Sequence, residues 1–106
     1  MFVVDSSRGV NWPQMKSFTK WLLRYFDISP RGTHVAYVVY ADGANLRFSF
    51  PLNLRPGMRY NVEDVRKSID GVGRATGTQR NVQLGLQLAQ QGFGTRFGGR
   101  PGAKKV

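Results

Sequence analysis

The stretch from His34 to Tyr40 constrains the fold more than any other part of this sequence. It reads His-Val-Ala-Tyr-Val-Val-Tyr and is almost continuously apolar and β-branched. Such a run is typical of a central strand that is buried on both faces. Asp42-Gly43 follows directly, and this pair is a strong signal for a tight hairpin. The chain therefore needs a partner strand beside this one and helices on both faces of the sheet.

The segment after the hairpin supplies the partner strand. Its apolar residues alternate with Arg47, Ser49 and Pro51, which is the pattern of a strand with one face exposed. A proline in a sheet is confined to an edge strand. The sequence predicts an antiparallel edge strand whose inward residues are Leu46, Phe48, Phe50 and Leu52.

The first strand is short and leads into a polar loop. Phe2 to Val4 is a brief apolar run, and Asp5 to Gly9 reads Asp-Ser-Ser-Arg-Gly. A helix is predicted next, with Pro13 in its first turn and Asn11 or Trp12 as its cap. This helix should end near residue 27, before a Ser-Pro-Arg-Gly turn. Its predicted core face, at helical spacing, is Met15, Phe18, Leu22 and Phe26.

Two further helices are expected in the second half. Asn61 should cap the first of them, with Glu63 and Asp64 in the first turn, where the helix dipole favours acidic residues. Its apolar face is Val62, Val65 and Ile69. After a loop over residues 71–78, a third helix is predicted from about residue 81 to 91, and Gly85 inside it indicates close packing. Its predicted stripe is Val82, Leu86 and Ala89, broadened by Leu84 and Leu88.

These elements predict an α/β fold: an open mixed sheet with helices on both faces. The expected strand order places the hairpin's edge strand first, the central strand next and the first strand last. We expect the first helix on one face and the other two mainly on the opposite face. Ligands bind such sheets at the carboxyl ends of strands, where Asp5-Ser6-Ser7 lies. Residues 1–93 form the domain, and 94–106 form a glycine-rich, basic, mobile tail.

The chain resembles the von Willebrand factor A-type, or integrin I-like, family. The resemblance covers nearly the whole chain in the right order, and it rests on the ordered series rather than on one motif. Its stretches are Phe2 to Ser7, Phe26 to Ala36, Val39 to Asp42, Phe48 to Leu52, Gly85 to Ala89 and Arg100 to Val106. The resemblance implies a Rossmann-like fold that is incomplete here, because residue 106 comes just before the family's fourth strand.

The resemblance also implies a metal-ion-dependent adhesion site (MIDAS). In the family a divalent cation, usually Mg²⁺, is held by an Asp-x-Ser-x-Ser loop, a later Thr and a still later Asp. Here Asp5 and Ser7 match the first positions, whereas Gly9 replaces the second Ser and offers no oxygen. Thr78 is the expected counterpart of the Thr, with Thr76 as the alternative, and the late Asp would lie beyond residue 106. We therefore expect a weak, incomplete site: no cofactor for this chain, and Mg²⁺ only in a complete parent domain.

The implied function is non-catalytic protein binding in cell adhesion or the extracellular matrix. His34 is the only histidine, and no Gly-x-Ser-x-Gly motif is present, so the sequence does not predict an enzyme. The resemblance implies an extracellular or cell-surface location, although no signal peptide precedes Phe2. The sequence contains no run of about 18 apolar residues, so it predicts no membrane span. The first strand would lack one neighbour, which predicts self-association through an exposed sheet edge.

The charge supports an alternative function. Sixteen Lys and Arg residues against six Asp and Glu give a net charge of +10, which favours acidic partners such as heparin-like glycans. Nucleic acid is not expected, because no nucleic-acid-binding motif accompanies the charge. The polyanion-binding candidates are Lys16, Lys20, Arg24, Arg96, Arg100, Lys104 and Lys105. A third alternative is a fragment of a larger adhesion protein with no separate function.

Overall fold

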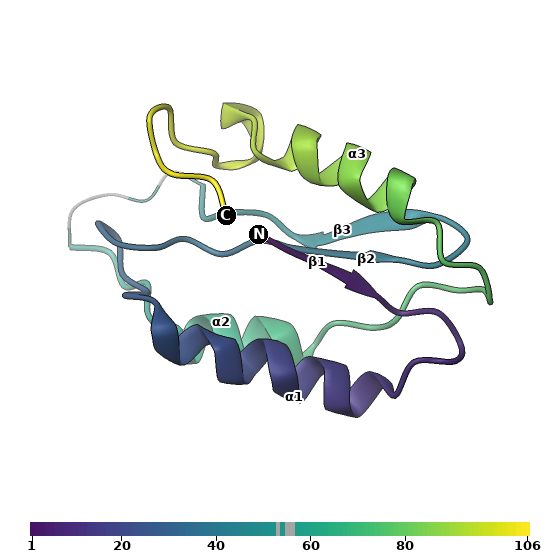
Figure 1. Ribbon diagram of the computed structural model, residues 1–106. Helices are drawn as coiled ribbons and strands as arrows, with labels where there is room; N and C mark the ends of the chain where they lie inside the picture. Colours follow the sequence, from purple (N-terminus) through teal and green to yellow (C-terminus); the bar gives the residue numbers. More distant parts are fainter. Residues whose placement is uncertain (53, 55–56) are drawn as a thin grey trace.

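The computed structural model describes residues 1–52, 54 and 57–106. The elements in chain order are β1 (Phe2–Asp5), α1 (Trp12–Leu22), η1 (Leu23–Tyr25), β2 (Tyr37–Tyr40), β3 (Ala44–Phe48), α2 (Val62–Asp70), α3 (Val82–Gly92) and η2 (Thr95–Phe97). The strands form one sheet in the order β1-β2-β3 (Figure 1). β1 runs parallel to β2, and β2 runs antiparallel to β3, so the predicted strand order is confirmed.

The central strand is buried as predicted. Tyr37, Val38 and Val39 are each 0% exposed. The strand itself begins at Tyr37 rather than His34, but the parallel pairing already starts where the amide of Phe2 donates to the carbonyl of Ala36 at 2.9 Å. The turn at Asp42-Gly43 closes the hairpin, with the amide of Ala41 donating to the carbonyl of Gly43.

The predicted edge strand is too long. β3 ends at Phe48, so the alternation beyond it does not continue the ladder. Phe50 is buried, at 7% exposure, against the ring of Phe93, whereas Leu52 is exposed. The hydroxyl of Ser49 donates to the carbonyl of Phe50, which is a local turn contact instead of a strand contact.

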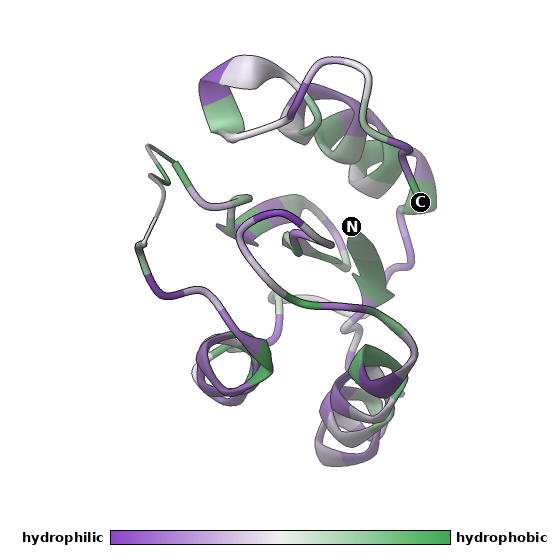
Figure 2. Cartoon of the chain, turned by 90° about the vertical axis from the view of Figure 1, so that its left-hand side faces the viewer, coloured by the Kyte–Doolittle hydropathy of each residue, from purple (hydrophilic) through white to green (hydrophobic). Residues whose placement is uncertain are grey.

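Helix α2 lies on the same face of the sheet as α1, and α3 covers the other face alone (Figures 1 and 2). The prediction that α2 would join α3 is therefore wrong. The reason is that Val65 and Ile69 pack into the core that the sheet shares with Trp12 and Leu23 of the α1 region. Polar contacts reinforce this pairing, because Asp70 at the end of α2 binds lysines of α1.

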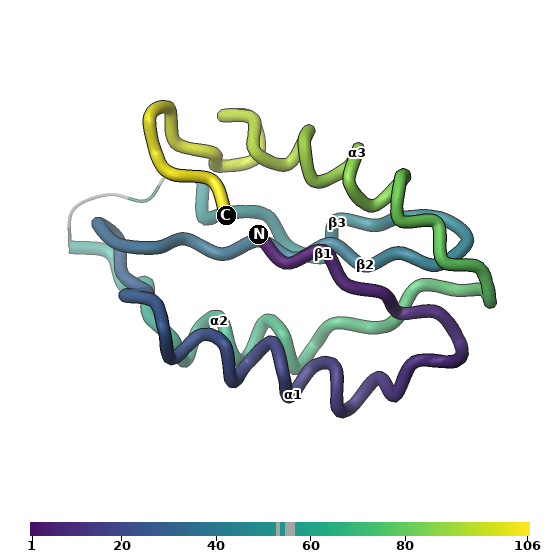
Figure 3. The backbone as a smooth tube through the Cα atoms, in the orientation of Figure 1, coloured from purple at the N-terminus to yellow at the C-terminus, as the bar shows by residue number. Residues whose placement is uncertain are grey.

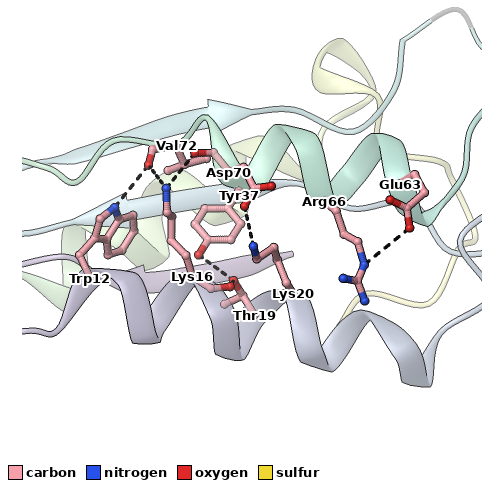
Figure 4. Close-up of polar contacts among 9 residues, drawn as sticks. All are labelled: Trp12, Lys16, Thr19, Lys20, Tyr37, Glu63, Arg66, Asp70 and Val72. Atoms are coloured by element: carbon pink, nitrogen blue, oxygen red, sulfur yellow. Dashed lines mark hydrogen bonds and ion pairs between the residues drawn. The ribbon is translucent and has the colours of Figure 1, made fainter.

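The core face predicted for α1 is also displaced. Phe18 and Phe26 are exposed, Met15 and Leu22 are half-buried, and the buried positions are Trp12, Thr19 and Leu23. Two hydrogen bonds turn the helix this way (Figure 4). The Thr19 hydroxyl pairs with the Tyr37 hydroxyl at 3.0 Å, and the Trp12 indole donates to the Val72 carbonyl at 3.3 Å. A buried hydroxyl that has a hydrogen-bond partner is tolerated. Thr19 therefore faces the core, where Phe18 was expected.

Helix α3 docks through its small residues instead of its large ones. Gly85, Ala89 and Gly92 are buried, Leu88 is half-buried, and Val82, Leu84 and Leu86 are exposed. The predicted stripe is therefore wrong at Val82, Leu84 and Leu86. The close packing predicted at Gly85 is confirmed. A Cβ atom at Gly85 would lie 2.8 Å from Cδ1 of Tyr40 and 3.2 Å from Cγ1 of Val3. The helix backbone therefore lies directly on the sheet.

The tail folds back over the start of the sheet. The Met1 ammonium donates to the Val106 carbonyl at 2.6 Å, and a guanidinium N–H of Arg100 donates to the Gly32 carbonyl at 2.6 Å. The two ends of the chain consequently lie next to each other (Figure 3). No helix in the described part of the chain is long and apolar enough to span a membrane.

The position of β1 leads to a prediction about self-association. β1 is an edge of the described sheet and is hydrogen-bonded there to β2 alone. A short apolar edge strand can pair with a second chain. We expect sedimentation of the 106-residue chain to show dimers or larger species at about 100 μM, with marginal stability. A monomer that unfolds cooperatively with more than about 5 kcal/mol would contradict this expectation.

Candidate functional site

The loop after β1 lies at the carboxyl edge of the sheet and is held by buried serines. Ser6 and Ser7 are 0% and 1% exposed. The Ser6 hydroxyl donates to the Tyr40 carbonyl at 3.2 Å and accepts the Ala75 amide at 2.8 Å. Ser6 thereby joins β1, β2 and the loop between α2 and α3. Asp5 accepts the Ser7 amide at 2.9 Å, which is the local turn expected of an Asp-x-Ser sequence.

Arg74 fixes this loop from outside. Its Nε donates to the Ser6 carbonyl at 3.1 Å, and its Nη2 donates to the carbonyls of Ser7 and Val10. These bonds satisfy backbone acceptors that a strand-to-helix loop would otherwise leave to water. Sequence alone does not indicate this role of Arg74, because an arginine in a glycine-rich loop has the pattern of a solvated surface residue.

Arg80 contacts two of the three residues predicted as metal ligands, Asp5 and Ser7. Its Nε lies 3.3 Å from Oδ2 of Asp5 and 3.4 Å from Oγ of Ser7. The Asp5 side chain is only 19% exposed, whereas that of Arg80 is 64% exposed. The guanidinium therefore covers the carboxylate and faces solvent. Arg80 was also missed from sequence, since nothing local relates it to a loop so far away along the chain.

Thr78 and Thr76 lie in the loop that borders this site, and both are exposed. Gly77 between them accepts the Arg8 amide at 3.1 Å, and the Gln79 amide donates to Oδ1 of Asp42 at 2.9 Å. The structure thus brings the threonine loop to the same edge as Asp5 and Ser7 through its neighbours. Which threonine corresponds to the family's ligand stays a prediction.

These residues do not fit a resident Mg²⁺ ion. Mg²⁺ requires about six oxygen ligands in near-octahedral geometry. Here one oxygen of Asp5 accepts the Ser7 amide and the other faces Arg80. Gly9 contributes no side chain, and a Cβ there would lie 3.5 Å from Nη2 of Arg80. Among the residues described, no three His, Cys, Asp or Glu side chains gather in a metal-binding group.

The basic residues proposed for polyanion binding lie in two groups, one on the α1 region and one in the tail, where Lys105 donates to the Arg100 carbonyl at 2.7 Å. Lys16 donates to the Asp70 and Val72 carbonyls, and Lys20 pairs with Asp70 at 2.6 Å, so both bridge α1 to α2 (Figure 4). The bond from Lys20 lowers the pKa of Asp70. Arg24 lies over the ring of Trp21. The other candidates, all in the tail region, are Arg96, Arg100, Lys104 and Lys105.

At the other end of the sheet a cavity of about 330 Å³ opens between the first strand, the tail and His34. Nε2 of His34 lies 2.9 Å from the Pro30 carbonyl, and its buried Nδ1 has no hydrogen-bond partner among the described residues. Burial lowers the pKa of His34, and nearby Arg100 lowers it further, whereas the hydrogen bond to the Pro30 carbonyl raises it. A second ring proton would consequently have no acceptor.

This geometry predicts how stability depends on pH. The folded pKa of His34 lies below its ordinary value of 6.5, so the unfolded chain takes up the proton first as the pH falls. We expect the urea midpoint to decrease as the pH is lowered from 7.5 to 5.5. We expect His34→Gln to make this decrease smaller. The Met1 ammonium, whose pKa is also lowered by burial, is present in both proteins. Its contribution to the pH dependence is therefore the same in both. Equal pH dependence in both would contradict the prediction.

An open α/β sheet with polar loops gathered at the carboxyl edge of its strands defines a class of ligand-binding domain. Comparison with known proteins narrows that class. The profile of the family described as "von Willebrand factor type A domain" matches residues 1–106. The chain belongs to this family, and its Rossmann-like mixed sheet is the family's fold.

Similar proteins carry names from cell adhesion and the extracellular matrix. The chain is 30% identical to integrin alpha-2 of Bos taurus, 27% to von Willebrand factor of Rattus norvegicus and 30% to matrilin-2 of Mus musculus. These matches cover 98%, 100% and 95% of this chain but only 8%, 24% and 10% of those proteins.

A solved structure supports the same assignment. Proximal thread matrix protein 1 from the mussel byssus is 28% identical, with a TM-score of 0.67, over 81% of this chain and 22% of that one. One structure of the byssus protein is described as having a zinc-occupied MIDAS motif.

The local geometry predicts weak Mg²⁺ binding by this chain. We expect titration calorimetry to give a dissociation constant weaker than about 1 mM, because Asp5 and Ser7 are bound to Arg80 and Gly9 offers no ligand. Gly9→Ser alone should not restore binding, since the guanidinium remains in place. Micromolar affinity in either protein would refute this prediction.

Proposed function

We propose that this chain is a non-catalytic protein-binding module of the cell-adhesion or extracellular-matrix type, located outside the cell or at its surface. It binds its partner through the carboxyl edge of the sheet and carries a degenerate metal site. One observation carries the proposal: Asp5, the Asp42 turn and the loop over residues 71–81 meet at a single edge (Figure 1). Family membership and the names of the relatives support the same function.

The test is solid-phase binding of the chain to a panel of purified extracellular-matrix proteins. Arg8 is exposed at the proposed edge, and within residues 1–52, 54 and 57–106 only its backbone amide holds the loop. Arg8→Glu should therefore weaken binding at least about fivefold without disturbing the fold. Arg66→Glu, an equal charge reversal on an exposed residue of α2, should change it by less than about twofold. Equal effects of the two variants would move the interface away from this edge.

The net charge of +10 supports one alternative, a polyanion-binding module. Charge-driven binding to a sulfated glycan releases counterions and weakens steeply with salt. Heparin chromatography separates the two functions: elution at modest salt disfavours the alternative. The structure gives the alternative little support, because Lys16 and Lys20 are engaged between α1 and α2.

A further inference from the structure

We propose that the guanidinium of Arg80 is the resident cation of this loop, and that it binds a carboxylate of the protein partner directly, with no metal ion. The inference rests on the proposed function and specifies its chemistry. It begins from the disagreement between the metal site that the family implies and the residues that the loop contains.

The first step is the orientation of Arg80. Both of its contacts within the described residues are made by Nε, to Asp5 and to Ser7. Asp5 is anchored in turn by the Ser7 amide. Among the described residues the Nη1 and Nη2 groups make no hydrogen bond or ion pair, although Nη2 lies beside Gly9. The side chain is 64% exposed, so these groups are open to a ligand. A planar guanidinium held on one edge offers parallel N–H groups on the other, which is the geometry that binds a carboxylate through two hydrogen bonds.

The second step is the local charge. Arg8, Arg74 and Arg80 surround the loop, against the carboxylates of Asp5 and Asp42. Three positive and two negative groups leave an excess of one positive charge at this edge. An anion arriving at Arg80 therefore meets a favourable field. A divalent cation instead meets a guanidinium that already occupies the carboxylate of Asp5.

The third step identifies the anion. Arg74 donates from Nε and Nη2 to the carbonyls of Ser6, Ser7 and Val10, so these donors serve the loop. The edge also carries the exposed Arg8, but Arg80 is the arginine whose guanidinium Asp5 and Ser7 hold in place. Nucleic acids and sulfated glycans bind through many phosphate or sulfate contacts at once. A compact site with one guanidinium held in place suits one Asp or Glu side chain on a protein surface.

The experiment titrates the ¹⁵N-labelled chain with a capped hexaglutamate peptide, once in EDTA and once in excess Mg²⁺. We expect the dissociation constants to agree within about twofold, with amide shifts centred on residues 5–9 and 77–81. Arg80→Gln should weaken binding at least about tenfold, because it removes the charged fork. Arg96→Gln, which removes the same charge from the η2 segment, should change it by less than about twofold. The amide spectrum also reports whether each variant is folded.

Arg80→Lys provides a second variant that keeps the charge. It should bind more weakly than the wild type and more tightly than Arg80→Gln, since an ammonium is a point charge without the fork. The inference is overturned if Mg²⁺ is required, if Arg80→Gln binds as well as Arg96→Gln, or if wild type does not bind. It is also overturned if a sulfated heparin oligosaccharide competes fully at equal charge.

The same variants separate this inference from the proposed function. If a matrix protein binds Arg80→Gln and wild type equally, the Arg80 assignment falls and the protein-binding function stands. If no matrix protein binds while hexaglutamate still depends on Arg80, the adhesion function falls and the metal-free anion site stands.

Discussion

Replacing Ile69 with alanine is expected to lower the free energy of unfolding by about 2–5 kcal/mol. Ile69 is 0% exposed and lies in the core between α2 and the sheet, with Val39, Trp12 and Leu23 in the same cluster. Alanine would leave a cavity there that the surrounding side chains cannot fill. A domain of this size has only about 5–15 kcal/mol in total, so the substitution would remove a large share of its stability.

The matched control is Leu86→Ala. Leu86 is 57% exposed on α3, although its spacing predicts a core residue. We expect its replacement to cost less than about 0.5 kcal/mol. Urea unfolding followed by circular dichroism measures both variants under the same conditions. A large loss in both variants would mean that α3 packs through its leucines. A small loss in both would mean that α2 does not contribute to the main core.

Gly77→Ala is the second change with a large expected effect. Gly77 has φ of 120°, and a Cβ atom there would overlap the Asp42 carboxylate. The residue must shift, which breaks the bond from the Gln79 amide to Asp42 and moves the loop that carries Arg80. Strain of this kind costs about 1–3 kcal/mol, to which the lost hydrogen bond adds. We expect the unfolding midpoint to fall and hexaglutamate binding to weaken together.

Gly73→Ala, in the same loop, is the control. A Cβ at Gly73 meets nothing within 4 Å. The substitution should be neutral, or should stabilise the chain by up to about 1 kcal/mol by restricting the unfolded state. If Gly77→Ala behaves in the same way, the loop does not have the conformation described.

Local signals in the sequence predicted local structure well. The Asp42-Gly43 turn, the Asn61 cap and the close packing at Gly85 are confirmed, because each depends on a few adjacent residues. The cap is a complete capping box: the Asn61 side chain accepts the Asp64 amide, and the Asp64 carboxylate accepts the Asn61 amide.

Helix orientation could not be predicted in the same way. Periodicity ranks Phe18 above Thr19 as a core residue, but the hydroxyl of Tyr37, on another element, determines which of them faces inward. The side of the sheet that α2 covers depends likewise on its partners in α1, far away in sequence.

The site shows the same division. Asp5 and Ser7 were recognisable because they follow a strand, and the structure places them at its carboxyl edge. Arg80 was not recognisable, since its role depends on a contact with a loop more than 70 residues earlier. A metal-binding pattern read from one segment cannot reveal a cation that another segment supplies.

The contact between Met1 and Val106 has a mechanical consequence. Tension applied between residues 1 and 106 would first load this contact and then the Phe2 end of β1, where the strand meets Ala36. The Asp5 end of β1, with its serines and Arg80, lies at the opposite end of the strand (Figure 1). The Phe2 end of β1 would therefore separate from β2 first. A partner bound at the loop edge would stay bound during the early part of the extension.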